Sequence, residues 1–299
     1  DESFSKNLPA GWVAILQHYF VSAWIPSQTE SHDFFASRLS NGDNVIGYKN
    51  ASVSIDAGDQ HTISQRLYVG PKDQVVLGDL AENLHLVIDY GWLWWLAQPL
   101  FWLLTLIQSF VVNWGLAIII LTIFVKLAFF RLSAASYKSM AKMRTVQPKI
   151  QSIRDQYAED KTKQQQAMME LWKKEKINPM GGCLPMLIQM PVFIALYWVL
   201  LESVELRHAP FILWINDLSA MDPYFVLPLL MGISMYLMQR LNPAPPDPMQ
   251  AKIMQYMPIA FTFLMMWFPA GLVLYWLCNN LLSFAQQYIV TRQIEQAAR

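Results

Sequence analysis

Polar side chains interrupt the most apolar stretches of this 299-residue chain, and one of them is a lysine. Lys126 lies within IILTIFVKLAFFR, residues 119–131, and Thr122 shares its helix face because residues four apart lie on one side of a helix. Further polar residues lie in two other apolar stretches: Gln189, Tyr275, Asn279, Asn280, Ser283, Gln286 and Gln287. Apart from the lysine these groups are uncharged hydrogen-bonding side chains, so their chemistry is to hold water and polar chain segments.

The depth of these residues along their helices indicates that they could meet. At 1.5 Å per residue, Lys126 lies about 8 Å from the charged end that Arg131 marks, and Gln189 lies at a similar depth in its own stretch. Polar groups inside a membrane normally face other protein or a water-filled cavity. The apolar turn FPAG, residues 268–271, closes the opposite end of the last stretch. The pattern therefore predicts a polar recess that opens to the cytoplasm and is closed on the outside.

Each of these residues also has a purely structural explanation. A lysine near a helix end can extend its alkyl chain to the membrane surface, and Lys126 has that reach. Gln189, Asn279 and Asn280 can form hydrogen bonds between helices without lining any cavity. The residues alone leave both explanations open, and their common depth favours the recess.

The sequence indicates no catalytic arrangement. Cys183, in GGCLP, has no His or Asp at a matching depth, and the apolar stretches hold neither the Ser–His pair nor the two aspartates of an intramembrane protease. A Gly-rich phosphate loop and an HExxH motif are absent, and two cysteines with five scattered histidines give no metal-ligand spacing. We therefore expect no enzyme activity, no cofactor and no metal ion.

Composition places the chain in a membrane. Hydrophobic residues make up 54% of it and charged residues 15%, well below the roughly 25% of a soluble domain. Four long stretches carry no charged residue: 90–125, 177–201, 223–239 and 253–291. Stretches of this length are typical of membrane-spanning helices.

The charges are divided unevenly between two parts of the chain. Residues 1–109 contain 5 Lys or Arg and 11 Asp or Glu, whereas residues 131–183 contain 11 and 5. Positively charged loops stay in the cytoplasm, so residues 131–183 are predicted to be cytoplasmic and residues 1–109 to lie outside. The first residues, DESFSKNLPA, hold no apolar export signal, so we expect a signal anchor upstream.

The predicted fold class is an α-helical integral membrane protein preceded by part of a β domain. Segments such as NVIGYK, ASVSID and HTISQRLYVG predict strands, which we assign to the C-terminal part of a periplasmic β-sandwich. The tryptophan-rich segment that follows predicts an amphipathic helix on the outer membrane surface. The predicted domains are residues 1–89 (β-sandwich and linker), 90–110 (interfacial helix), 111–291 (five-helix transmembrane core) and 292–299 (short cytoplasmic tail).

The core is predicted to contain five spans and one cytoplasmic hairpin. The spans are expected at about 111–131, 184–201, 223–241, 254–269 and 270–290. The hairpin, residues 132–183, is predicted as two antiparallel helices, KSMAKMRTVQPKIQSIRDQY and KTKQQQAMMELWKKEK, on either side of a break at AEDK. Its basic surface could simply set the topology, or it could dock a ribosome or anionic lipid headgroups.

Several motifs resemble a known family. GGCLPMLIQMPVFIALY (181–197), WFPAGLVLYWLCNNLLSFAQQ (267–287) and YKSMAKMRTVQPKIQ (137–151) closely resemble the YidC/Oxa/Alb family of membrane protein insertases. GWVAILQHYFVSAWIP (11–26) resembles the periplasmic domain of the Gram-negative bacterial YidC branch. The resemblance covers essentially the whole chain. It implies five core helices, a periplasmic β-sandwich and a first transmembrane helix upstream of a truncated N-terminus.

The resemblance also implies a function. The family's insertases and chaperones move short polar tails of client proteins across the inner membrane through a positively charged hydrophilic groove, open to cytoplasm and lipid. They release the client helices into the bilayer, alone or with the Sec translocon. The groove charge is usually an arginine in the first core helix. Lys126 stands at that position, which keeps the charge but loses the two-pronged pairing of an arginine.

Site residues and partners follow from the recess and the resemblance together. The expected groove residues are Thr122, Lys126, Gln189, Tyr275, Asn279, Asn280, Ser283 and Gln286. The expected substrate slide, a lipid-facing surface for client helices, consists of Met190, Phe193, Ile259, Ala260, Leu264 and Trp276. The implied partners are nascent membrane proteins, the ribosome, the Sec translocon and membrane lipids, without direct nucleic-acid specificity.

Two other functions remain open at this point. A small-molecule channel or transporter could use the same recess, although the chain lacks the internal repeats that many transporters show. A purely structural assembly factor could hold helices for the Sec translocon, and would then depend on Sec for every client.

Overall fold

The computed structural model describes residues 4–175, 184–242 and 248–297, which form two compact units. The first unit comprises Asp1–Tyr90 with Glu202–Glu205, and the second comprises Gly91–Leu201 with Leu206–Arg299. We describe each by itself.

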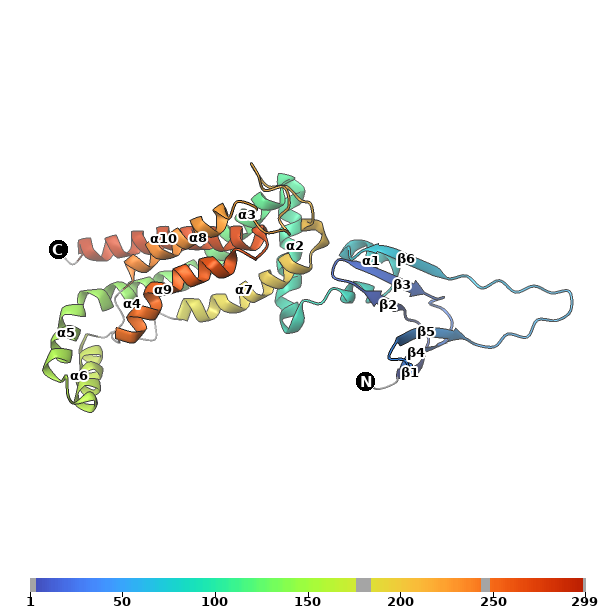
Figure 1. Cartoon of the computed structure of the whole chain (residues 1–299), viewed down its shortest axis with the longest axis horizontal. Coiled ribbons are helices and arrows are strands. Elements are labelled where there is room, and N and C mark those ends of the chain that lie inside the picture. Colours follow the sequence, from blue (N-terminus) through green and yellow to red (C-terminus); the bar gives the residue numbers. More distant parts are fainter. Residues whose placement is uncertain (1–3, 176–183, 243–247, 298–299) are drawn as a thin grey trace. The chain divides into compact units, whose positions relative to one another are not determined.

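The first unit is built on two three-stranded antiparallel sheets (Figure 1). Its elements are β1 (Phe4–Leu8), β2 (Val13–Leu16), β3 (Phe20–Ile25), β4 (His32–Arg38), β5 (Asn44–Asn50), β6 (Arg66–Pro71), α1 (Gln74–Leu80) and η1 (Leu84–Val87). The strand orders are β1-β4-β5 and β2-β3-β6. Val21, Ala23 and Ile25 alternate along β3 and are all buried, as a strand with one face on a core requires. Asp73 begins α1, because its carboxylate accepts hydrogen bonds from the N–H groups of Val75 and Val76.

The strand predictions are confirmed in part. β5 covers the predicted NVIGYK, and β6 covers only the last part of HTISQRLYVG. The prediction of a strand at ASVSID is wrong, since residues 51–65 form a long connection without strand structure (Figure 1). Val53 and Ile55 there are exposed. β-Branched residues favour a strand only where neighbouring strands offer cross-strand contacts, and this segment has none.

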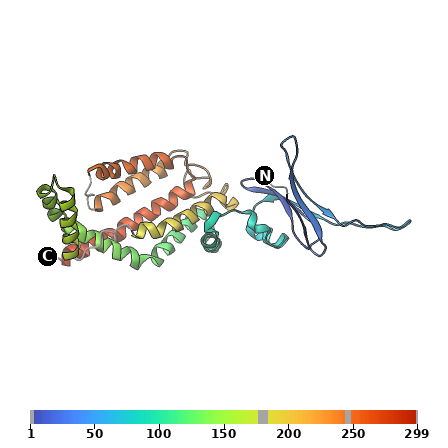
Figure 2. The same ribbon diagram turned by 90° about the horizontal axis from the view of Figure 1, so that it is seen from below.

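The second unit is helical. Its elements are η2 (Gly91–Leu93), α2 (Trp94–Val111), α3 (Trp114–Ala128), α4 (Phe130–Thr145), α5 (Gln147–Gln156), α6 (Lys161–Lys174), α7 (Leu184–Glu202), η4 (Val204–Leu206), α8 (Val226–Leu241), α9 (Pro248–Met265) and α10 (Ala270–Ala297). Glu202, the last residue of α7, belongs to the first unit. Val204 and Glu205 of η4 also belong to it, whereas Leu206 belongs to the second unit. The long helices α3, α7, α8, α9 and α10 run side by side, whereas α2 crosses their direction (Figures 1 and 2).

Helix lengths constrain how this unit could lie in a membrane. Among the described residues, one helix, Gly91–Val111, is long and apolar enough to cross a bilayer alone, and the bent pair α3–α4 would make a second. The first of these is the helix that the sequence assigns to the membrane surface. The direction of α2 across the long helices fits a helix that lies on the membrane surface, and this placement stays a prediction. α3 and α8 have only 15 and 16 residues, so each spans about 24 Å or less, against about 30 Å of hydrocarbon.

The first predicted span is broken at Phe129. We expected one helix to about Arg131, but α3 ends at Ala128 and α4 continues at an angle of 68°. The bend lays α4 along α10, where Gln286 Nε2 donates to the carbonyl of Phe130 at 2.9 Å. A hydropathy profile cannot predict a tertiary contact of this kind, because it reports only that the segment is continuously apolar.

The predicted two-helix hairpin has three helical pieces. The first predicted helix divides at Val146 into α4 and α5, and Pro148 lies in the first turn of α5. Proline lacks the N–H that a continuous helix needs, but it is tolerated in a first turn, so the helix restarts there. α5 and α6 then pair through Val146, Ile150, Met143, Met168 and Leu171. Residues 176–183 of the predicted hairpin lie outside the described residues.

The last two helices differ from prediction mainly in length. α9 begins at Pro248 rather than about 254, and α10 extends to Ala297, so much of the predicted tail is helical. The predicted tight turn between them is confirmed. Hydrogen bonds hold this turn against the loop between η4 and α8. The N–H groups of Ala270 and Gly271 donate to the carbonyls of Ala220 and Leu218 in that loop.

The packing of α8 on α9 generates a first prediction. A Cβ added at Gly232 would overlap Thr262 Oγ1, which is held by a hydrogen bond to the carbonyl of Pro258. Gly232→Ala should therefore lower the free energy of unfolding by about 1–3 kcal/mol through overpacking. Thermal unfolding of the protein in detergent measures the effect. Thr262→Ala in the same chain should restore part of the loss.

Gly78→Ala is the matched control, because a Cβ at Gly78 would meet nothing within 4 Å. The same substitution in the open helix α1 should be neutral or stabilising. Equal unfolding temperatures for Gly232→Ala and the wild type would show that α8 and α9 are not closely packed at this point.

A buried ion pair holds part of the first unit. Lys72 is only 5% exposed, and its Nζ lies 3.4 Å from Glu202 Oε2. His18 Nδ1 approaches the other oxygen of the same carboxylate at 3.8 Å. Removal of one member of a buried pair leaves the other charge uncompensated, which is more damaging than removal of both.

The ion pair gives a second prediction. Lys72→Met should lower the free energy of unfolding by about 3–5 kcal/mol, and Lys72→Met with Glu202→Leu should recover most of it. Chemical unfolding followed by circular dichroism measures both variants. Lys6→Met, on an exposed strand position, is the control. If the double variant is no more stable than Lys72→Met, the pair does not act as a unit.

Candidate functional site

The helical unit contains a central cavity of about 280 Å³ between α4, α7, α8, α9 and α10. Predicted groove or slide residues form much of its lining: Gln189, Met190, Phe193, Tyr275, Trp276, Asn279, Asn280 and Ser283. Gln287, which the sequence places in the polar stripe of the last helix, also lines it. Residues that were not predicted complete the lining: Tyr137, Met140, Met235, Met238, Gln239, Asn242, Met254, Met257 and Pro258. The cavity therefore gathers side chains from five helices that are far apart in the sequence.

One side of the cavity is polar because α10 presents its amide and hydroxyl side chains there. Asn280 Nδ2 donates to Ser234 Oγ at 3.2 Å, and Gln287 Nε2 donates to Asn242 Oδ1 at 2.8 Å. These bonds connect α10 to α8 and its C-terminal end. They also show that the interhelical role considered for the polar stripe is real for Asn280. Gln287 Oε1 is buried without a partner among the described residues.

The lining of the cavity is also rich in methionine. Met140, Met190, Met235, Met238, Met254 and Met257 come from four different helices. Methionine is unbranched and polarisable, so a surface made from it adapts to differently shaped partners. The spacing of 235 with 238 and of 254 with 257 is the i, i+3 signal that sequence reasoning could have used. Tyr137 and Met140 were missed because the bend at Phe129 was not foreseen.

Lys126 lies behind the cavity wall and does not line it. The residue is 6% exposed, and its Nζ donates to Ser283 Oγ at 2.6 Å. Ser283 Oγ in turn donates to the carbonyl of Asn279 at 2.6 Å. Lys126 makes no ion pair with any carboxylate among the described residues, and it does not extend to the surface as a snorkelling lysine would. Its charge therefore meets the cavity through one serine hydroxyl.

Two other predicted groove residues also lie outside the cavity lining. Thr122 is 1% exposed, and its hydroxyl donates to the carbonyl of Ile118 in its own helix at 2.7 Å. Gln286 is buried against α4 through its bond to Phe130. The structure thus brings Gln189, Asn279 and Ser283 together and places Thr122 and Gln286 in helix interfaces.

The predicted slide residues fall into two groups. Phe193 and Trp276 contact each other edge to face, with ring centroids 4.3 Å apart, and Phe193 also stacks with Tyr275. Met190 joins them at the cavity. Ile259, Ala260 and Leu264 instead lie on an exposed face of α9, where Ile259 is 68% exposed.

The side chains that line the cavity offer hydrogen bonds, and Lys126 adds a positive charge behind Ser283. Among the residues that the structure describes, no group of three or more His, Cys, Asp or Glu could hold a metal ion. Cys183 lies outside the described residues.

The buried lysine generates a third prediction. Ser283→Ala removes the hydrogen-bond acceptor of Lys126 and should lower the free energy of unfolding by about 1–3 kcal/mol, because an unmade bond to a buried charged group is costly. Lys126→Met combined with Ser283→Ala should be more stable than Ser283→Ala alone. Thermal unfolding in detergent measures both.

Ser109→Ala is the control, since Ser109 is exposed and its hydroxyl donates only to the carbonyl of Leu106 in its own helix. If Ser283→Ala and Ser109→Ala unfold at the same temperature, the lysine finds another partner and the hydrogen bond is not structural.

Known protein families match both parts of the chain. Residues 106–297 match the family model "60Kd inner membrane protein", and residues 1–103 match "YidC periplasmic domain". Proteins named "Membrane protein insertase YidC" from Marinomonas sp. (strain MWYL1) and Azotobacter vinelandii are 64% and 57% identical over 299 residues. Both alignments cover 100% of this chain and 54% of the relative. The chain therefore spans about half the length of these relatives.

One solved structure shows the same fold. "Active YidC insertase crystal structure with the first transmembrane domain resolved" matches with a TM-score of 0.57 and 22% sequence identity. The match covers 96% of this chain and 80% of that chain. At this identity the likeness supports the β-sandwich and helical architecture, and nothing finer.

Proposed function

This chain belongs to the 60Kd inner membrane protein family, whose relatives are named YidC insertases, and we propose that it acts as a membrane protein insertase and chaperone. In this proposal it moves short polar tails of client proteins across the inner membrane and releases their helices into the bilayer. The family is one of insertases and not of catalytic enzymes. The chain itself would need no cofactor, because transfer of the client's apolar helix out of water supplies the driving force.

The observation that carries the proposal is the central cavity, whose lining combines amide and hydroxyl groups with methionine and aromatic side chains. A polar tail that crosses hydrocarbon loses its hydrogen bonds to water, at a cost of several kcal/mol for each unpaired group. Gln189, Asn279 and Ser283 offer replacement hydrogen bonds at membrane depth. Gln239, Asn242 and Gln287 add further amide groups to the cavity lining. The short helices α3 and α8 favour a thinned bilayer beside it.

Lys126 would supply the attraction for an acidic tail. A buried charge acts strongly because the surrounding helices have a low dielectric constant. The Ser283 hydroxyl lies between the ammonium group and the cavity, so it can turn its hydrogen bonds toward an incoming carboxylate while the lysine stays in place. In this proposal Lys126 attracts the client tail through Ser283 and does not itself line the cavity. The sequence instead suggests a groove that Lys126 lines directly.

Client helices would leave along α9 and its neighbours. Ile259, Phe263 and Leu264 are exposed on α9, and an exposed apolar face of this kind suits lipid or an apolar helix. Phe193 and Trp276 stand at the junction between this face and the cavity. The proposed path runs from the polar cavity to the exposed face, as an insertase that opens to lipid requires.

The topology that completes the proposal follows the charge distribution. The β unit would be periplasmic, while the α5–α6 hairpin and the C-terminal end would be cytoplasmic, with the helices of the core between them as a multi-pass unit. The hairpin would meet ribosomes that deliver nascent clients. The protein would act alone or together with the Sec translocon.

The insertion mechanism gives a fourth prediction. In vesicles that contain the full-length protein, Lys126→Ala should lower insertion of a small client with an acidic N-terminal tail by about tenfold, equivalent to about 1.4 kcal/mol. Lys126→Arg should retain most of the activity because it keeps the charge. A protease-protection assay of the translocated tail measures insertion.

A client with a neutral tail is the control for charge, and it should respond much less to Lys126→Ala. If both clients insert equally well with Lys126→Ala, the charge is not a receptor. Solute flux through vesicles that show no insertion would favour a channel instead, and complete dependence on Sec would favour a passive assembly factor.

A further inference from the structure

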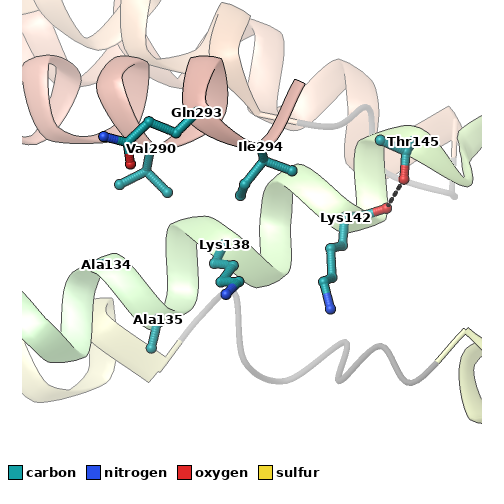
Figure 3. Close-up of a pocket in the computed structure, with 8 residues that line it drawn as sticks. All are labelled: Ala134, Ala135, Lys138, Lys142, Thr145, Val290, Gln293 and Ile294. Carbon is teal, nitrogen blue, oxygen red and sulfur yellow. Dashed lines mark hydrogen bonds between the residues drawn. The ribbon is translucent and has the colours of Figure 1, made fainter. Parts of the chain in front are cut away.

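A second hollow lies away from the central cavity, between α4 and the C-terminal part of α10. We call it the α4–α10 groove. It has a volume of about 700 Å³ and is lined by Ala134, Ala135, Lys138, Lys142, Thr145, Val290, Gln293 and Ile294 (Figure 3). None of these residues lines the central cavity, so the insertion mechanism leaves the groove without a role.

The groove has a cationic edge. Lys138 and Lys142 are four residues apart on α4, so they lie one above the other on the same helix face. Figure 3 shows both side chains projecting from α4 on the side away from α10. Both are exposed, and neither forms an ion pair with any residue that the structure describes. Two neighbouring ammonium groups without an acidic partner attract anions.

The floor of the groove is apolar. Val290 and Ile294 reach from α10 toward α4 (Figure 3), and Ala134 and Ala135 add small apolar side chains from α4 to the lining. The hydroxyl of Thr145 is already engaged, since it donates to the carbonyl of Lys142 at 2.8 Å. The lining thus combines apolar side chains on the α10 side of the groove with two positive charges at its outer edge on α4, a combination that suits an amphiphile better than a free ion.

The position along α10 places this groove at the membrane boundary. Val290 follows Ala270 by twenty residues, about 30 Å along the helix, so it lies at or just beyond the edge of a hydrocarbon layer of about 30 Å or less. Tyr288 and Arg292 lie on the same turns, with the guanidinium 5.3 Å from the ring centroid. Tyrosine and arginine at one level are typical of the interface between lipid and water.

We propose that the α4–α10 groove binds an anionic phospholipid of the cytoplasmic leaflet. Its phosphodiester headgroup lies against Lys138 and Lys142, and an acyl chain lies along Val290 and Ile294. This proposal rests on the membrane orientation given under the proposed function. Such a lipid would fasten α4 to α10, and α4 contributes Tyr137 and Met140 to the central cavity. The bound lipid would therefore hold one wall of the insertion site.

A lipid fits this groove better than ribosomal RNA does. A phosphate backbone would be attracted to the same lysines, but it has no apolar part for Val290, Ile294 and the two alanines. The level of the groove along α10 also places it in the headgroup region. The α5–α6 hairpin carries further exposed lysines, among them Lys161 and Lys163, and these are better placed for a ribosome.

The test uses the full-length protein in vesicles of equal parts phosphatidylcholine and phosphatidylglycerol. The protein is released in mild detergent, and native mass spectrometry counts the retained lipids. The wild type should retain phosphatidylglycerol selectively. Lys138→Gln with Lys142→Gln should reduce this selectivity by about 30-fold, from roughly 1 kcal/mol for each basic residue near an anionic surface.

Three variants make the result specific. Lys161→Gln with Lys163→Gln removes the same charge from α6 and should leave selectivity unchanged. Lys138→Arg with Lys142→Arg should preserve it and shows that the site tolerates substitution without unfolding. Val290→Ser with Ile294→Ser should weaken retention although both lysines remain, because the acyl chain loses its floor.

Several outcomes would overturn the proposal. Equal selectivity in the wild type and the Lys138→Gln/Lys142→Gln variant would do so, whether or not ribosome binding falls in that variant. Release of the lipid by inorganic phosphate would show a phosphate site and not a lipid site. Insertion assays on the same preparations keep the two hypotheses apart. Selective lipid retention without insertion would contradict only the proposed function, whereas insertion without selectivity would contradict only the lipid site.

Discussion

The ammonium group of Lys126 needs a hydrogen-bond acceptor inside an apolar helix bundle. The packing of the core helices depends on which residue supplies that acceptor. Ser283 on α10 supplies the acceptor, so α3 and α10 have to lie close together at one depth. Asn279, one turn earlier, accepts from Ser283 and fixes the hydroxyl. A buried charge without such support would be expensive, which makes this contact the least replaceable one in the helical unit.

The bend between α3 and α4 depends on the same helix. Gln286 lies one turn beyond Ser283 and bonds the carbonyl of Phe130, which holds α4 along α10. On another face of α10, Asn280 and Gln287 bond to Ser234 and Asn242. α10 therefore makes polar contacts with α3 and α4 on one side and with α8 on another. The central cavity lies between α10 and the helices α4, α7, α8 and α9. Residues of α10 line both the proposed insertion site and the proposed lipid groove.

Much of this organisation can be predicted from the sequence, and the remainder cannot for identifiable reasons. Hydropathy and charge predict the helical unit and the β unit, and the polar spacing on α10 predicts a site that contains Asn279 and Ser283. The spacing of Thr122 and Lys126 predicts a shared helix face correctly, but it cannot reveal that both face a packed interface. That outcome depends on which helix is the neighbour. The break at Phe129 and the unpaired segment 51–65 have the same origin, because tertiary partners decide them and local propensity does not.

Water accessibility at single positions tests the central claim most directly. In a full-length protein from which every native cysteine has been removed, Asn279→Cys and Thr122→Cys would be labelled with a membrane-impermeant maleimide from each side of the membrane. The account predicts labelling of position 279 from the cytoplasmic side only and very slow labelling of position 122. Equal protection of both positions would show a dry helix interface, and labelling of position 279 from both sides would show a channel. Either result would contradict a hydrated cavity that is closed on the outside.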